Sequence, residues 1–341
     1  MHPLTGNKLA LAGIILAIVP IIAWIYIVRK QFDISNRKTY RINVLTARTS
    51  LFLPLYAIYL WISVLDPYTN EALEPFYAVV EGYSFYSMFA LLVTNLGGPR
   101  ATVIILRKHP DRHTFCPCYP HDSQMLYNTV LSAMRYMFFG RVLLVIVATV
   151  CTYSDLQSLY LIVTAASLGV LIYGVLSIIN FYEVIMHLDL GHVFKLITLK
   201  VSVGLIVIQG LVEEILFSMG VFDAVKPHPS YTAEGTVLRY YCFIVLLEYL
   251  LFSVAVGYFY SREVRFLGFV PVRSKSQHSI TSISEAGRIS DVESEVEKAE
   301  KSFCVFLGDI LSFTDLWSKY SLTLPEDGVG DPLLSDLTPV V

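Results

Sequence analysis

The chain contains seven apolar stretches, each long enough to cross a lipid bilayer as a helix. A helix rises ~1.5 Å per residue, so about 20 residues cross a hydrocarbon core of ~30 Å. Of the 341 residues, 55% are hydrophobic and 16% are charged, which leaves too few polar side chains to cover a soluble globule. The sequence therefore predicts an all-α, polytopic bundle of seven transmembrane helices. The expected spans lie near residues 9–28, 44–65, 76–96, 138–154, 158–182, 196–222 and 239–260.

Basic residues gather in alternate loops between these stretches. Lys and Arg mark short cytosolic loops, so the pattern places the N-terminus outside and the C-terminus in the cytosol. Residues 1–265 then form the transmembrane domain and residues 266–341 form a cytosolic tail. The basic loops carry Arg29, Lys30, Arg37, Lys38 and Arg41, then Arg100, Arg107, Lys108, Arg112 and Arg135, then Lys195, whereas the intervening loops carry Asp66, Glu71 and Glu74, and Asp155.

The tail differs in composition from the rest of the chain. Residues 273–302 are rich in Ser, Glu and Lys and poor in aromatic residues, so they cannot bury enough apolar surface to fold. We therefore expect a largely disordered tail. Within it, residues 303–317 alternate apolar and polar side chains at near-helical spacing, which predicts an amphipathic segment. This segment either lies on the inner leaflet or docks on the bundle as a short packed helix.

Two carboxylates fall inside expected spans: Glu81 in the third and Glu248 in the seventh. A charged side chain at mid-membrane costs about 2.5–3.5 kcal/mol on insertion scales, so each one needs a reason. Glu81 is expected about five residues inside the outer end of its span, close to Tyr86. Either these carboxylates line a cation, proton or solute pathway, or they fix packing through interhelical hydrogen bonds, for instance to Gln209. Both alternatives are open on the sequence alone.

Three basic residues lie near the cytosolic ends of expected spans. The side chains of Arg48, Arg141 and Lys200 are long enough to reach the headgroups, so we expect them to anchor the helices in the bilayer. Pro54 lies inside the second span, where it predicts a kink or a lost backbone hydrogen bond.

The third loop contains histidines and cysteines between residues 109 and 121, but their spacing does not suit a metal. A Cys-x-Cys pair, Cys116 and Cys118, replaces the usual Cys-x2-Cys pair, and no second ligand pair follows. We therefore expect no metal and no cofactor. Juxtamembrane cysteines beside basic residues suit S-acylation, which would hold the loop on the inner leaflet; unmodified thiols are the alternative.

Sequence features of enzymes and of nucleic-acid-binding proteins are absent. The chain has no Gly-x-Ser-x-Gly, no His-Glu-x-x-His and no Gly-rich phosphate-binding loop, so we do not expect an enzyme. Its formal net charge is -3, without the basic excess that nucleic-acid binding requires.

Motifs on successive spans resemble one known family. They are RTSLFLPLYAIYLWIS from Arg48, EGYSFYSMFALLVTNLGG from Glu81, FKLITLKVSVGLIVIQ ending at Gln209, and LLEYLLFSVAVGYFYSRE around Glu248. In order and spacing they resemble the organic solute transporter alpha-subunit family over residues 40–265, and CPCYP at residues 116–120 is similar to a reduced form of its cysteine-rich loop.

The resemblance implies a passive carrier of amphipathic organic solutes, such as steroid conjugates or bile-acid-like anions. It implies a multi-pass protein of the plasma membrane, with endomembranes also allowed, that works with a separate single-span beta subunit and can form homo-oligomers. Two departures bear on the solute. Tyr59 stands where relatives often have Asp, and the acidic residue that many relatives place before Leu-Gly-Gly is missing from residues 93–95.

Two other classes share a seven-helix pattern. A seven-helix receptor ranks lower, because the third span ends in Leu-Gly-Gly-Pro-Arg instead of Asp-Arg-Tyr and the seventh span has no Asn-Pro-x-x-Tyr. A membrane-organising or trafficking factor that moves no solute fits the same residues, since a fold does not determine a function.

Overall fold

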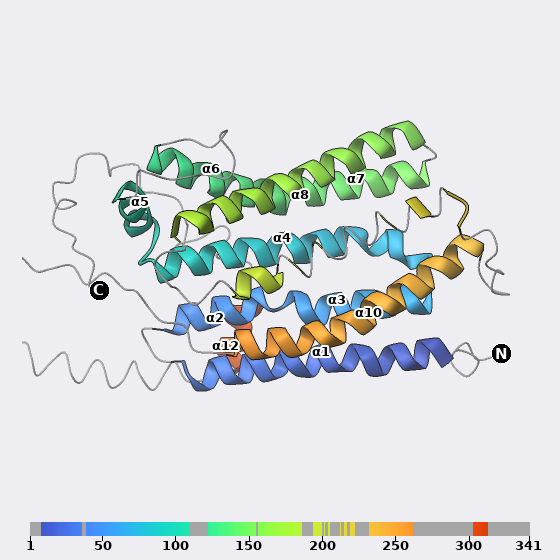
Figure 1. The fold of residues 1–341 in the computed structure, drawn as a ribbon, viewed down its shortest axis with the longest axis horizontal. Coiled ribbons are helices and arrows are strands. Elements are labelled where there is room, and N and C mark those ends of the chain that lie inside the picture. Colours follow the sequence, from blue (N-terminus) through green and yellow to red (C-terminus); the bar gives the residue numbers. More distant parts are fainter. Residues whose placement is uncertain are drawn as a thin grey trace, which may run out of the picture.

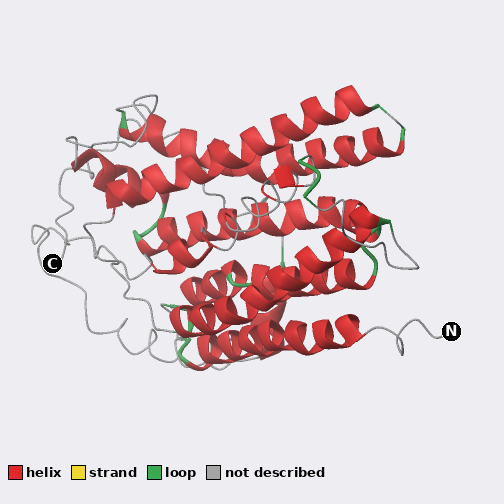
Figure 2. Ribbon diagram, turned by 45° about the vertical axis from the view of Figure 1, so that its right-hand side comes forward, coloured by secondary structure: helices red, strands yellow, loops and turns green. Residues whose placement is uncertain are grey.

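Every regular element in the part of the chain that the structure describes is a helix (Figure 2). The computed structural model describes residues 8–35, 39–108, 122–154, 156–185, 194–199, 232–261 and 303–312, together with scattered positions between 201 and 221. The prediction of an all-α fold is confirmed for these residues. The helices are α1 (Lys8–Asp33), α2 (Tyr40–Thr49), α3 (Phe52–Leu65), α4 (Thr69–Asn95), α5 (Pro99–Lys108), α6 (Ser123–Arg135), the π-helical turn η1 (Tyr136–Gly140), α7 (Arg141–Tyr153), α8 (Gln157–Ile185), α10 (Ala233–Tyr260) and α12 (Phe303–Leu311).

Six helical segments of the described chain are long and apolar enough to cross a membrane. Helices α1, α4, α8 and α10 each supply one of them (Figure 1). The other two are composite: α2 and α3 together cover Tyr40–Leu65, and α6, η1 and α7 form one rod over Ser123–Tyr153. The expected span over residues 196–222 lies largely outside the described residues. The seven-span count and the orientation therefore stay predictions.

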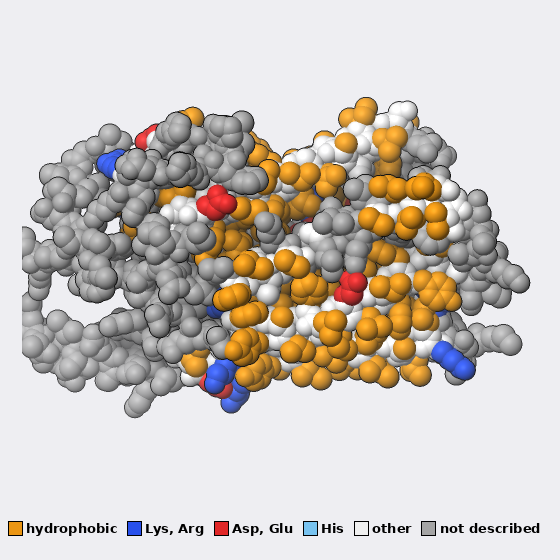
Figure 3. Space-filling view, in the orientation of Figure 1, with side chains coloured by type: hydrophobic (Ala, Val, Ile, Leu, Met, Phe, Trp, Pro, Cys, Tyr) orange, Lys and Arg blue, Asp and Glu red, His pale blue; other side chains and the backbone are white. Residues whose placement is uncertain are grey.

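Large apolar side chains cover the outer helices. Leu11 and Ile15 on α1 and Leu161 and Ile162 on α8 are each more than 60% exposed. Figure 3 shows apolar side chains over most of the described surface between the two ends of the bundle, with Lys and Arg at those ends. Such an apolar belt is typical of a surface in contact with lipid. We call the end where α1 finishes and α5 begins the basic end; it is the predicted cytosolic end.

Helix α4 lies at the centre of the bundle (Figure 1). Protein buries 89% of its membrane window, compared with 28% for α1. Helices α2 and α3 pack against α4, and so do η1, α6 and α7, while α1 and α10 cover α3 and α8 covers α6 and α7. A polar side chain on α4 is therefore surrounded by protein instead of lipid.

The Leu96-Gly97-Gly98 run ends α4 and turns the chain into α5. The Gly98 amide donates to the Val93 carbonyl at 2.9 Å and the Gly97 amide donates to the Thr94 carbonyl at 3.1 Å, which is the pairing of a Schellman motif. The two glycines have φ angles of 99° and 91°, a region that strains residues with a side chain. The turn directs α5 onto α6, where the sequence had suggested only a loop.

Pro54 lies in the first turn of α3, not inside a continuous helix. Helix α2 ends at Thr49 and α3 begins at Phe52, so the helix is interrupted between these two residues. The first-turn amides of a helix have no intrahelical acceptor, so proline costs no hydrogen bond there. Where the sequence predicted a kink or a lost backbone hydrogen bond, the structure has a short interruption between two helices.

The turn η1 is clamped between two glycines. A Cβ atom on Gly82 of α4 would lie 2.8 Å from the Cα atom of Phe138, and one on Gly174 of α8 would lie 2.6 Å from the Sδ atom of Met137. Small residues let helix backbones approach this closely. Because a π-helical turn inserts an extra residue, it also rotates the helix that follows. The clamp on η1 therefore sets the direction in which α7 presents its side chains.

We expect Gly82→Ala to destabilise the protein. The added methyl group would meet backbone atoms of Phe138, and overpacking of this kind costs about 1–3 kcal/mol. The measurement is the Tm of the purified protein in detergent. Gly169→Ala on α8 is the matched control, because nothing lies within 4 Å of its Cβ position. Equal Tm values for the two variants would contradict the clamp.

Candidate functional site

A buried ion pair joins α4 to α7 inside the bundle. Glu81 is fully buried, and its carboxylate contacts the guanidinium of Arg141, which is 8% exposed. Glu81 lies almost midway between the ends of α4 at Thr69 and Asn95. Coulomb attraction is stronger in such a medium than at a protein surface, and each charge offsets the desolvation cost of the other. We call Glu81 and Arg141 the ion pair.

One expectation about these charges is wrong. Helix α4 begins at Thr69, before the expected start of the span near residue 76, and the depth of Glu81 in the bilayer stays a prediction. Arg141 does not reach the headgroups, because the rod that contains it begins at Ser123 and carries it into the interior of the bundle. Sequence reasoning therefore recognised Glu81 as a candidate but missed its partner.

Tyrosines from three helices form a connected layer beside the ion pair. The ring centroid of Tyr56 on α3 lies 4.3 Å from that of Tyr77 on α4 and 5.6 Å from that of Tyr249 on α10. Tyr59 on α3 lies 5.2 Å from Tyr77. Tyr56 and Tyr77 are within electrostatic range of Arg141. We call these four residues the tyrosine layer; it offers apolar ring faces and polar hydroxyls together.

The other predicted site residues lie on α4, on α10 or outside the described residues. Tyr86 is buried in α4, farther toward the basic end. Glu248 is partly buried in α10, directly before Tyr249 of the tyrosine layer, and α10 packs mainly against α1 and α3. Gln209, Cys116 and Cys118 lie outside the described residues.

A further buried cation lies at the basic end. Lys195 is 2% exposed, and its Nζ atom lies 5.8 Å from the ring centroid of Tyr260, at the end of α10. The Tyr260 hydroxyl donates to the Lys195 carbonyl at 2.8 Å. Lys195 is outside the six membrane-spanning segments. Because burial disfavours the charged ammonium, the pKa of Lys195 is lowered to about 7. This side chain can therefore gain or lose a proton near neutral pH.

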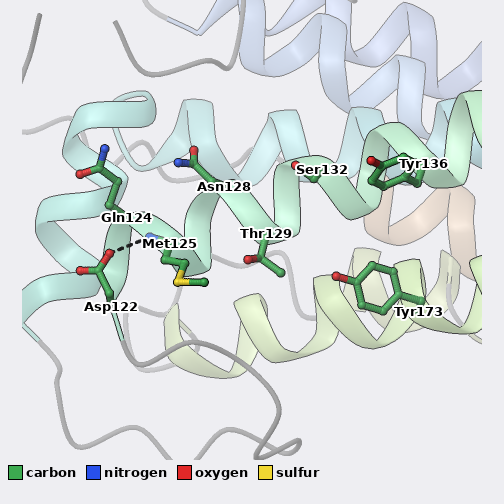
Figure 4. Close-up of a pocket in the computed structure, with 8 residues that line it drawn as sticks. All are labelled: Asp122, Gln124, Met125, Asn128, Thr129, Ser132, Tyr136 and Tyr173. Atoms are coloured by element: carbon green, nitrogen blue, oxygen red, sulfur yellow. Dashed lines mark hydrogen bonds between the residues drawn. The ribbon is translucent and has the colours of Figure 1, made fainter. Parts of the chain in front are cut away.

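A polar groove of about 560 Å³ runs between α6 and α8 (Figure 4). Asp122 lies at one end, where its carboxylate accepts the Met125 amide at 2.9 Å and caps α6. Tyr136, the first residue of η1, and Tyr173 of α8 lie at the other end. The groove therefore gives a polar surface along the α6 and η1 part of the rod that carries Arg141. Its lining residues are Asp122, Gln124, Met125, Asn128, Thr129, Ser132, Tyr136 and Tyr173.

The chemistry of the site suits recognition of charged and polar groups. The guanidinium of Arg141 offers up to five donors in a plane that fits carboxylate and sulfate groups, and Glu81 supplies the matching negative charge. Tyrosine hydroxyls beside them can donate or accept hydrogen bonds. Among the described residues, no cluster of three His, Cys, Asp or Glu side chains is arranged to hold a metal ion. The ion pair and the tyrosine layer together form our candidate binding site.

Removing one member of the ion pair should cost more than removing both. Glu81→Gln leaves Arg141 buried without its counter-charge, a loss of about 3–5 kcal/mol, whereas replacement of both charges is often close to neutral. We expect Glu81→Gln and Arg141→Gln each to lower the Tm in detergent, and the double variant to be more stable than either. If the destabilisations simply add, the two charges do not depend on each other.

Comparisons with known proteins agree with the motifs on the spans. The model of the family "Organic solute transporter Ostalpha" matches residues 9–264, about three quarters of the chain. Over 111 residues the chain is 33% identical to "Vacuole membrane protein hfl11" of Schizosaccharomyces pombe, a match that covers 32% of this chain and only 25% of that protein. No solved structure matches the chain. The family match covers the membrane-spanning helices and the ion pair, and the chain belongs to the organic solute transporter Ostalpha family.

Proposed function

We propose that the protein is a carrier for amphipathic organic solutes, such as steroid conjugates or bile-acid-like anions. The observation that carries this proposal is the ion pair with its tyrosine layer, buried inside a bundle whose outer face is apolar. Membership of a transporter family supports it. A solute with an anionic group and an apolar body matches a site that combines a guanidinium, hydroxyls and aromatic rings.

In the proposed mechanism, the anionic group of the solute competes with Glu81 for Arg141. A guanidinium binds carboxylate and sulfate groups in the same bidentate way, so one partner can replace the other without leaving Arg141 uncompensated. The tyrosine layer would hold the apolar body of the solute and offer hydroxyls to the displaced carboxylate. This exchange needs only the gradient of the solute, so transport proceeds by facilitated diffusion in either direction.

We further propose where the carrier works and with which partners. The family resemblance supports a single-span beta-like subunit and the plasma membrane, and homo-oligomers are compatible with it. The name of the fission-yeast relative supports a location on endomembranes as well. Fluorescent tagging of the full chain, with and without a single-span partner, distinguishes the two membranes.

A membrane-organising or trafficking factor is the second candidate. The ion pair favours it in one respect: Glu81 and Arg141 already compensate each other, and a purely structural role needs nothing more. In this alternative the bundle binds lipids or proteins and moves no solute.

Uptake and efflux of a labelled steroid sulfate and a labelled bile acid test the carrier. Cells should express the chain alone and with candidate single-span partners, and surface or organelle delivery is checked by labelling. We expect saturable flux that follows the solute gradient in both directions. Absence of flux despite confirmed delivery and a partner would favour the membrane-organising factor.

The tyrosine layer gives a prediction about affinity. Tyr77→Phe keeps the ring in its contacts with Tyr56 and Tyr59 but removes a hydroxyl near Arg141. In the proposed mechanism this hydroxyl donates to a carboxylate in the solute-bound state, and the loss of a hydrogen bond to a charged group costs about 1.5–3 kcal/mol, so we expect the KM for flux to rise roughly tenfold or more. Tyr240→Phe is the matched control, because Tyr240 is 55% exposed on α10. The same KM in both variants would remove the tyrosine layer from the solute pathway.

A further inference from the structure

Helix α12, from the C-terminal tail, is inserted at the basic end of the bundle (Figure 1). Phe306 and Ile310 are fully buried against α1 and α2. The ring of Phe306 makes edge contacts with Phe32 at 5.5 Å and with Tyr40 at 5.7 Å, measured between centroids. Of the two placements that the sequence allows for this segment, residues 303–311 have the docked one in the structure, and residues 313–317 lie outside the described residues.

The C-terminal end of α12 binds to three polar side chains of the bundle: Arg48, Tyr83 and Tyr40, whose hydroxyl donates to the Asp309 carboxylate at 2.6 Å. The Arg48 guanidinium donates to the Asp309 carbonyl. The Tyr83 hydroxyl lies 3.0 Å from the Ile310 carbonyl and 3.1 Å from the Ser312 carbonyl. Carbonyl groups at the end of a helix carry a partial negative charge, and Asp309 adds a carboxylate, so α12 presents negative charge to these side chains.

Arg48 is a buried cation that favours a negative partner. It is 3% exposed, although the sequence predicted that it would extend to the headgroups, and that prediction is wrong. Its guanidinium carbon lies 5.6 Å from the ring centroid of Tyr83. In the contact with α12, Arg48 donates to a backbone carbonyl, whereas a sulfate or carboxylate group offers a guanidinium a full charge and two oxygens. The anionic group of a solute can therefore take the place of α12 at this arginine.

The surface under α12 has a cationic, polar end and an apolar part, which match the anionic group and the apolar body of the proposed solute. Beside the polar end formed by Arg48 and Tyr83, the buried side chains Val28, Val44 and Ala47 form an apolar floor on which Phe306 and Ile310 pack. Removal of α12 would thus expose a cationic and hydroxyl-bearing end joined to an apolar surface. An anion with a rigid hydrocarbon body fits both parts.

We propose that Arg48 and Tyr83 bind the anionic group of an amphipathic solute at the basic end, and that α12 occupies this site as an intramolecular competitor. This inference rests on the proposed function for the identity of the solute. Tyr83 is two residues from Glu81 on α4, so the site is close to the ion pair along the helix but lies on a different face of α4. Release of α12 opens the site, and docking of α12 closes it.

The experiment releases α12 without changing the site itself. Phe306→Asp places a charge against the apolar floor, whereas Val305→Asp is the matched control on the exposed face of α12, where Val305 is 52% exposed. Hydrogen exchange of the amides of residues 303–311 reports release in the full-length protein. Equilibrium binding of a labelled steroid sulfate to the protein in nanodiscs reports the site.

We expect Phe306→Asp to speed amide exchange in residues 303–311 and to raise the affinity for the steroid sulfate about tenfold, while Val305→Asp changes neither. Arg48→Gln and Tyr83→Phe, each added to Phe306→Asp, should reverse the gain; Tyr83→Phe keeps the ring and so preserves packing. A synthetic peptide of residues 303–312 should compete with the steroid sulfate in the released protein.

Two results would overturn the proposal: faster exchange with unchanged affinity, or a gain in affinity that survives both added substitutions. This experiment measures binding, whereas the proposed function is tested by flux through the unmodified chain, so the two can fail independently. If the unmodified chain carries no solute but the released protein binds the steroid sulfate through Arg48, the carrier function is rejected and the competitor site is supported. If flux is present but release of α12 leaves the affinity unchanged, the carrier function is supported and the competitor site is rejected.

Discussion

Burying a lone carboxylate or a lone guanidinium inside a membrane protein has a large desolvation cost, and the packing of this bundle brings one of each into contact. Glu81 is on the most deeply buried helix, where protein and not lipid surrounds it. Arg141 reaches it because η1 is pressed between Gly82 and Gly174 and turns α7 toward α4. The same contacts bring the tyrosine layer beside the charges. Packing around η1 and electrostatics at the ion pair are thus parts of one arrangement.

The sequence was sufficient for the all-α fold and for the family, and it singled out Glu81 as a candidate, because apolar runs and an isolated intramembrane carboxylate are local signals. It was not sufficient for Arg141. Outward-facing polar residues of α6, such as Gln124 and Asn128, interrupt the apolar run, so the expected span began near residue 138. The cap at Asp122 was a signal that the helix begins earlier. The pairing itself depends on packing around η1, which no local pattern reveals.

Basic side chains near helix ends illustrate the same limit. Arg48, Arg141 and Lys195 all belong to segments that a hydropathy pattern places near the cytosolic headgroups, yet all three are buried in the structure. Their burial depends on elements far away in the chain: α12 for Arg48, α4 for Arg141 and the end of α10 for Lys195. Tertiary contacts therefore decide which charged side chains of this protein are buried. Analysis of each span separately predicts too few buried charges.

The rod of α6, η1 and α7 is 31 residues long, which corresponds to ~46 Å of helix, while a hydrocarbon core needs only ~30 Å. One continuous element thus joins α7, which carries Arg141, to the basic end, where α5 packs on α6. Because Arg141 directly follows the clamped turn η1, a rigid rotation of the rod about the glycine clamp would move the far tip of α6 more than it moves Arg141.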